Sequence, residues 1–97
     1  MVDVNDRVSV SSYGNYSQNY GTHTVEITIG RLQLMFSYST IVAFRTPETG
    51  MVVSENCFSQ TTGRHLNCID GGRKEHRVDR EEFENKLREI LKNYDLI

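Results

Sequence analysis

The chain has 97 residues, of which 37% are hydrophobic and 25% are charged, and its formal net charge is −2. A domain of this length buries roughly 60 to 68 per cent of the surface of its unfolded chain, so there is room for one core. The near balance of acidic and basic residues disfavours a nucleic acid or a membrane as an electrostatic partner. No apolar run is long enough to span a bilayer, and residues 1–10 lack the apolar centre of a secretion signal. We therefore expect one domain, residues 1–97, in the cytoplasm and without membrane contact.

Residues 1–23 are predicted to form a polar arm. Valines alternate with polar residues in 1–10, which fits a short edge strand or a loose arm, and the loose arm is the simpler interpretation. Residues 11–23 are rich in Ser, Asn and Gly, with large side chains at Tyr13, Tyr16 and Tyr20. These tyrosines could stack on nucleic-acid bases, at ~1–3 kcal/mol per base, or cover the edge of the core. The segment 11–23 contains no Lys or Arg, which favours the second alternative.

The longest β-type pattern in the chain begins at Thr24 and alternates apolar with polar residues on both sides of Gly30-Arg31. Gly30 can supply the positive φ that a type II′ turn needs at its first central position. A hairpin with this turn pairs Ile29 with Leu32, Ile27 with Leu34, and Val25 with Phe36. All six apolar side chains then lie on one face, and this agreement predicts the register.

Two more strands follow the hairpin. Ile41–Phe44 is apolar on both faces, with Val42 and Phe44 on one side and Ile41 and Ala43 on the other, which is typical of a central strand. Residues 46–50 contain turn-forming Pro and Gly, and Met51–Val53 is the next strand. Because the second face of this antiparallel meander is partly apolar, we expect part of it to be covered, and a homodimer through sheet faces or edges would do so.

The candidate site lies in the unusual stretch Ser54–Gly72, in which we interpret residues 61–67 as a loop. Hydroxyls, a glycine, a guanidinium, an imidazole and an amide occur here within seven positions: Thr61, Thr62, Gly63, Arg64, His65 and Asn67. Hydroxyls and backbone amides at a glycine-centred bend can hold an anion, and Arg64 can bind a phosphate or carboxylate through two parallel hydrogen bonds. The alternative is a loop whose polar side chains satisfy their own backbone while Arg64 is solvated.

Residues 68–78 are predicted to form two strands around an Asp-Gly turn, the second being charged and suited to a sheet edge. The basic residues Arg73, Lys74 and Arg77 of this edge, with the tyrosines of the arm, define a nucleic-acid-binding alternative. A helix over 79–95 follows, with Asp79 as its N-cap and Glu82 three residues later. Its apolar stripe must pack on the sheet, because no other element is available: Phe83, Leu87, Ile90, Leu91 and Tyr94.

A metal or enzymatic site could be imagined from four residues, Cys57, His65, Cys68 and His76. Structural zinc sites usually use short C-x2-4-C and H-x3-5-H pairs, which this series lacks. No nucleophile elbow, HExxH, phosphate loop or dinucleotide fingerprint occurs in the sequence. These observations favour a non-catalytic protein without a cofactor, and they favour two free thiols over a disulfide or a metal site.

Five short motifs are spread over most of the chain: Tyr13-Gly14, Ala43-Phe44-Arg45, Val52-Val53, Thr61 to Asp70, and Arg77 to Phe83. In these motifs the chain resembles a family of small uncharacterised domains found in phage and prokaryotic genomes. Cys57 and Cys68 depart from the pattern, because the family has an aromatic residue there, and this favours packing roles for the two thiols. The resemblance implies no activity, because the family has no assigned function.

The sequence thus predicts an α+β fold with a polar arm (1–23), an antiparallel sheet of about five or six strands (24–78) and a C-terminal helix on one face (79–95). The favoured function is a small non-catalytic binding or protein-interaction domain, with a protein partner or a small anionic ligand held at Thr61–Asn67. Nucleic-acid binding, and a metal protein or enzyme, are the alternatives.

Overall fold

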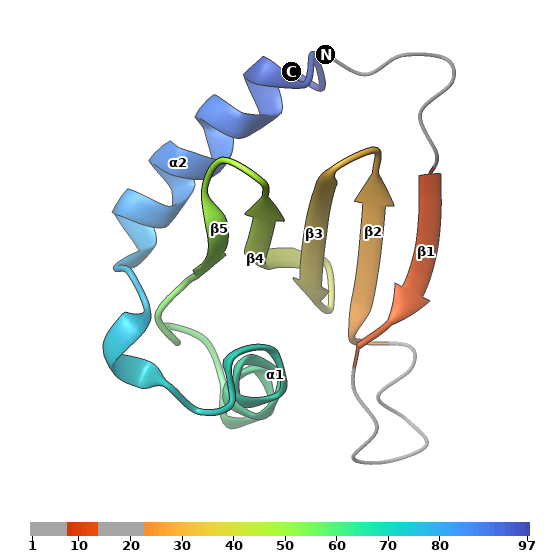
Figure 1. The fold of residues 1–97 in the computed structure, drawn as a ribbon. Helices are drawn as coiled ribbons and strands as arrows, with labels where there is room; N and C mark the ends of the chain where they lie inside the picture. The colour runs from red at the N-terminus through yellow and green to blue at the C-terminus, as the bar shows by residue number, and fades with distance from the viewer. Residues whose placement is uncertain (1–7, 14–22) are drawn as a thin grey trace.

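The computed structural model describes residues 8–13 and 23–97 (Figure 1). Its antiparallel sheet has the order β1-β2-β3-β4-β5, formed by β1 (Val8–Ser12), β2 (Val25–Ile29), β3 (Leu32–Ser37), β4 (Thr40–Thr46) and β5 (Gly50–Val53). The helices are α1 (Gln60–Asp70), the short 3-10 helix η2 (Lys74–His76) and α2 (Arg80–Asn93). The α+β fold, the antiparallel meander and the C-terminal helix are therefore as predicted, and α1 is an additional element.

The hairpin of β2 and β3 has the predicted register. Ile29 pairs with Leu32 and Ile27 with Leu34. Gly30 has a φ of 60°, and Arg31 is not among the residues with positive φ, which is the pattern of a type II′ turn. The face that carries Leu32 and Leu34 is the one on which α2 packs. The periodicity and the turn chemistry therefore predicted this hairpin correctly.

β4 is the central strand of the core, and a bulge changes the way in which its side chains alternate. Ile41 pairs with Phe36 and Ala43 with Met35, so Val42 is an extra residue between the two pairs. The prediction that Val42 shares a face with Phe44 is wrong for this reason: Val42 packs with Ala43 on the second face. β4 thus contributes fully buried side chains to both faces of the sheet.

Helix α2 covers the first face. The cluster on this side contains Leu32, Leu34, Phe44, Phe83 and Ile90, and the rings of Phe44 and Phe83 lie 5.5 Å apart. The Asp79 carboxylate accepts a hydrogen bond from the Glu82 amide at 2.9 Å, which confirms the predicted N-cap. Val78 packs against the same cluster, as expected for the residue that precedes the cap.

Helix α1 replaces the predicted loop at 61–67 and the predicted strand at 68–73. The Ser59 hydroxyl accepts a hydrogen bond from the Thr62 amide, and Gly71, with a φ of 68°, ends the helix by donating its N–H to the Asn67 carbonyl. The inward residues are spaced at i, i+3, i+4 and i+7: Thr62, His65, Leu66 and Ile69. The pattern was missed because two of these residues are polar and because Thr and Gly are weak helix formers.

The second predicted strand, 74–78, is also wrong. Residues 74–76 form η2, and only Val78 reaches the sheet, where it makes a parallel bridge with Ser54 next to β5. At the opposite edge, β1 belongs to the sheet although residues 8–12 were assigned to the arm. The strands therefore extend from 8 to 53 instead of from 24 to 78. Figure 1 shows both helices toward the β4 and β5 side of the sheet, with β1 at the far edge.

We predict that Leu66→Ala lowers the free energy of unfolding by about 2 to 5 kcal/mol, because a fully buried leucine is replaced by a cavity between α1 and the sheet. Leu96→Ala is the control, since Leu96 is 38% exposed near the end of the chain. Urea unfolding of both variants measures the difference. A change within about 0.5 kcal/mol for Leu66→Ala would mean that α1 does not pack on the sheet as described.

Candidate functional site

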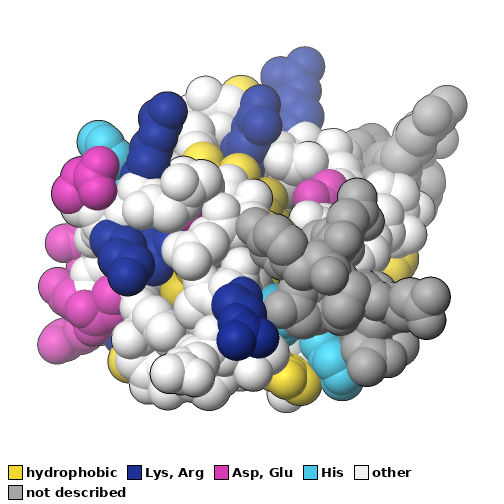
Figure 2. All heavy atoms as spheres, turned by 90° about the horizontal axis from the view of Figure 1, so that it is seen from below, with side chains coloured by type: hydrophobic (Ala, Val, Ile, Leu, Met, Phe, Trp, Pro, Cys, Tyr) yellow, Lys and Arg dark blue, Asp and Glu magenta, His cyan; other side chains and the backbone are white. Residues whose placement is uncertain are grey.

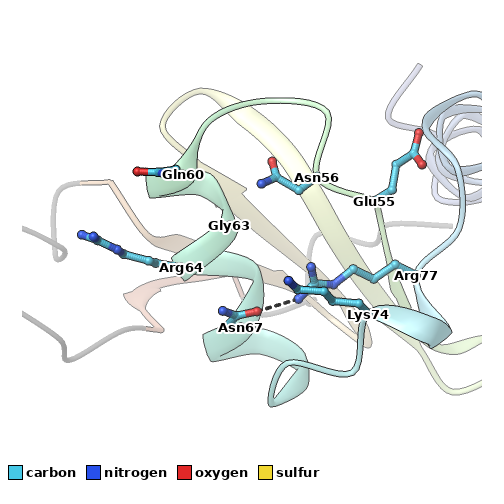
Figure 3. Close-up of a pocket in the computed structure, with 8 residues that line it drawn as sticks. All are labelled: Glu55, Asn56, Gln60, Gly63, Arg64, Asn67, Lys74 and Arg77. Carbon is cyan, nitrogen blue, oxygen red and sulfur yellow. Dashed lines mark hydrogen bonds between the residues drawn. The ribbon is translucent and has the colours of Figure 1, made fainter.

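A groove of about 670 Å³ runs along the outer side of α1 (Figure 3). One wall is α1, and the other is made by the segment after β5 and by the segment around η2. The lining residues are Glu55, Asn56, Gln60, Gly63, Arg64, Asn67, Lys74 and Arg77. Figure 3 shows Gln60 and Arg64 extending from α1 on the side away from Lys74 and Arg77, whose side chains extend toward α1 from the opposite wall.

Arg77 fixes the two walls of the groove to each other. Its Nε donates to Asp70 Oδ2 at 2.7 Å, and one terminal nitrogen donates to Asp70 Oδ1 at 2.9 Å and to Asn67 Oδ1 at 3.0 Å. The side chains of Arg77 and Asp70 are only 4% and 10% exposed. Burial alone would raise the pKa of Asp70. The hydrogen bonds from Arg77 and from the Gly72 and Arg73 amides, together with the Arg77 charge, outweigh burial and lower this pKa.

Gly63 lets the other wall approach α1 closely. A Cβ atom at this position would lie 2.9 Å from Asn56 Nδ2. That amide nitrogen donates to the Ser59 carbonyl at 3.0 Å, and Asn56 Oδ1 accepts from the Phe58 amide at 3.1 Å. Glycine at position 63 therefore keeps the Asn56 side chain against the first turn of α1, where it forms part of the groove.

The inner side of α1 carries a buried polar cluster. Ser37 Oγ lies 2.7 Å from His65 Nδ1 and 2.9 Å from Thr62 Oγ1. The ring of His65 lies 5.8 Å from that of Tyr38, which in turn lies 4.4 Å from the ring of His23. Burial lowers the pKa of His65, and an electrostatic interaction with His23 lowers it further. His65 is therefore held in its neutral form more strongly than a solvated histidine.

The six predicted site residues are divided between the two sides of α1. Gly63, Arg64 and Asn67 line the groove. Thr62 and His65 are buried against the sheet, and Thr61 is half-buried and does not line the groove. The helical period separates residues that a loop would have gathered together. Sequence reasoning did not connect these residues with the other wall, because Glu55, Asn56 and Lys74 reach the groove only through the tertiary fold.

The residues of the nucleic-acid alternative do not form one surface in the part of the chain that the structure describes. Tyr13 is partly buried against the second core cluster, and its hydroxyl donates to the Phe36 carbonyl at 2.6 Å, so this side chain contributes to the packing of the core. Burial raises the pKa of the Tyr13 hydroxyl, and an electrostatic interaction with Cys68 raises it further. Tyr16 and Tyr20 lie outside the described residues. Figure 2, a view from below, shows Lys and Arg side chains standing apart on this face.

The Cys and His series does not form a metal site. Among residues 8–13 and 23–97, no three His, Cys, Asp or Glu side chains gather as metal ligands, so Cys57, His65, Cys68 and His76 are not brought together. Both cysteines are free, Cys57 being exposed and Cys68 half-buried. The hydrogen bond of Ser37 with His65 resembles a nucleophile and its base, but Ser37 is 3% exposed and His65 is fully buried, so a substrate cannot reach them.

Comparison with known proteins identifies the family of the chain. A family of unknown function, DUF8033, matches residues 7–85. The chain belongs to this family. The DUF8033 match extends from β1 through α1 and η2 into the first turns of α2, so it includes every residue that lines the groove. No curated protein and no solved structure matched the chain. In the described part of this DUF8033 member, no helix has the length and hydrophobicity that are needed to cross a bilayer.

We predict that the protein loses stability as the pH falls below 6.5, the ordinary pKa of histidine, because His65 has a lower pKa in the folded state. The unfolded chain then binds more protons than the folded one, so acidification favours unfolding, whereas stability is constant above this range. Urea unfolding between about pH 5 and pH 8 measures the slope.

His65→Asn should make this slope smaller, since the amide can replace the ring Nδ1 in the bond with Ser37 but does not titrate. The control is His76→Gln, a change at an exposed histidine that should leave the slope unaltered. An equal slope in the His65→Asn variant and the parent protein would show that His65 does not cause the pH dependence.

Proposed function

We propose that the protein is a non-catalytic binding domain that holds an anionic group, from a small ligand or a protein partner, in the groove along α1. The observation that carries the proposal is the position of Arg64 and Lys74 on the walls of one groove. Within residues 8–13 and 23–97, neither side chain makes an ion pair. Arg77 is already paired with Asp70, so Arg64 and Lys74 are the cations that remain for a ligand.

The lining of the groove fits an oxygen-rich anion. A guanidinium can bind a phosphate or carboxylate through two parallel hydrogen bonds. A lysine ammonium adds a compact positive charge that an anion can approach from many directions. The amide side chains of Asn56, Gln60 and Asn67 add neutral donors. Glu55 carries the one carboxylate of the lining, and its Oε1 accepts a hydrogen bond from the Arg80 amide at 3.3 Å. The net charge of the lining residues is therefore positive, which favours an anion.

The groove supports binding better than catalysis. Among residues 8–13 and 23–97, no Ser, Cys, His or Tyr that could act as a nucleophile or as a general acid at neutral pH lines the groove. A phage-associated setting is part of the proposal and is based on the motif resemblance alone. A protein partner would present the same chemistry through an acidic side chain or a phosphorylated one.

The test uses inorganic phosphate as the probe and nuclear magnetic resonance of the backbone amides as the readout. We expect phosphate to shift the signals of Gly63, Arg64 and Asn67. Arg64→Ala and Lys74→Ala should each weaken binding about fivefold, which corresponds to about 1 kcal/mol for a partly solvated charged contact. Acidic peptides, used as a second probe, distinguish a carboxylate from a phosphate ligand.

Arg31→Ala is the matched control, because it removes an exposed cation at the turn between β2 and β3, outside the groove. Arg77→Ala is unsuitable, since it would leave the buried Asp70 unpaired and cost about 3 to 5 kcal/mol of stability. If Arg31→Ala weakens binding as much as the two groove variants do, the anion is attracted by the general surface charge and the proposal fails.

A further inference from the structure

The outer edge of β1 is an open sheet edge. β1 is the first strand in the order of the sheet, and among the described residues no strand pairs with its outer side. All five residues are exposed, including Val8 at 65% and Val10 at 67%. An edge of this kind presents unpaired backbone donors and acceptors, and it is a template on which another chain can pair.

The register identifies which backbone groups of β1 point outward. The Tyr13 amide donates to the Thr24 carbonyl at 3.1 Å, so this pair is a hydrogen-bonded one. The pairing of β1 with β2 continues without a shift through Ser11 with Glu26 and Ser9 with Thr28. Because the direction of the backbone groups alternates along a strand, Ser9 and Ser11 bond to β2. The N–H and C=O groups of the remaining residues point away from the sheet: Val8, Val10 and Ser12.

This edge lacks the features that normally prevent strand pairing. The sequence Val-Ser-Val-Ser-Ser contains no charge and no proline, and its regular register with β2 contains no bulge. Val8 and Val10 lie opposite Ile29 and Ile27, which are only half-buried. The apolar stripe of the first face thus continues to the edge of the sheet, beyond the part that α2 covers.

We propose that β1 pairs antiparallel with β1 of a second copy of the chain, around a two-fold axis at Val10. Val10 then lies opposite Val10 of the second copy, and Val8 lies opposite Ser12. The backbone groups of Val8, Val10 and Ser12 all point outward. The three pairs that these residues form with the second copy therefore contribute about six hydrogen bonds, two for each pair. The two sheets join into one continuous sheet.

The absence of charged residues in β1 favours a second copy of the chain as the partner that pairs with this edge. Self-pairing across a two-fold axis places each residue opposite a residue of the same strand, so an edge with charges of one sign would oppose like charges. β1 has no charge, and its own copy therefore meets it without repulsion, with Ser9 opposite Ser11 on the second face. This interface is independent of the groove, because the groove is lined by residues of α1 and of the segments on either side of α1.

The test combines analytical ultracentrifugation with hydrogen exchange of the unmodified protein. From about 10 µM to about 1 mM, we expect a monomer–dimer equilibrium. In the dimer, the amides of Val8, Val10 and Ser12 should be protected and should lose protection on dilution. The amides of Ser9 and Ser11 should be protected at every concentration, because they bond to β2 within the chain.

Val10→Pro removes an outward N–H without removing a bond to β2, so it should abolish the dimer and leave the protection of β3 and β4 unchanged. Val10→Thr is the matched control that keeps the N–H and the strand propensity, and it should still form the dimer. A monomer throughout the concentration range, or protection of Val8, Val10 and Ser12 that does not depend on concentration, would overturn the proposal. A dimer that survives Val10→Pro would overturn it as well.

Discussion

The structure depends on the fact that its central strand, β4, buries side chains on both faces. Val42, Ala43 and Phe44 have no exposed surface, and the bulge at Val42 directs two of them to the second face. A strand of this kind is stable only if the sheet is covered on both sides. Helix α2 covers Phe44, and α1 covers Val42 and Ala43 through Leu66. The sequence predicted that part of the second face is covered, and α1 of the same chain covers Val42 and Ala43 there.

Helix α1 connects the core to the groove, because its inner side packs on the sheet and its outer side lines the groove. The inner side holds His65, Thr62 and Leu66 against the sheet, while Arg64 and Asn67 on the outer side face the groove. The bond from Arg77 to Asp70 and Asn67 then attaches the end of α1 to the chain that returns to β5. Because contacts within the chain fix both walls, the shape of the groove is set by the fold itself, which reduces the entropy cost of the anion binding proposed above.

The parts that were predicted correctly are those with strong local signals. The hairpin at Gly30 has a turn residue and an apolar alternation that agree, and α2 has both an N-cap at Asp79 and an apolar stripe. For α1, Ser59 and Gly71 were available as start and stop signals, and residues 62, 65, 66 and 69 have helical spacing. The interpretation as a loop gave more weight to Thr, Gly and Asn, which are common in turns. The candidate residues 61–67 therefore lie on both sides of a helix, and only Gly63, Arg64 and Asn67 among them line the groove.

Arg80 illustrates what a sequence cannot reveal. Its guanidinium lies between the rings of Phe58 and Phe83, at 5.2 and 4.9 Å from their centroids, and donates to the Ile41 carbonyl at 3.0 Å. These contacts join residues that are far apart in the chain. The sequence by itself determined the elements whose stability is local: the hairpin of β2 and β3 and the capped, amphipathic α2. The tertiary structure decided that residues 60–70 form a helix and which side chains share the groove, because burial against β4 and the bonds of Arg77 outweigh weak helix propensity.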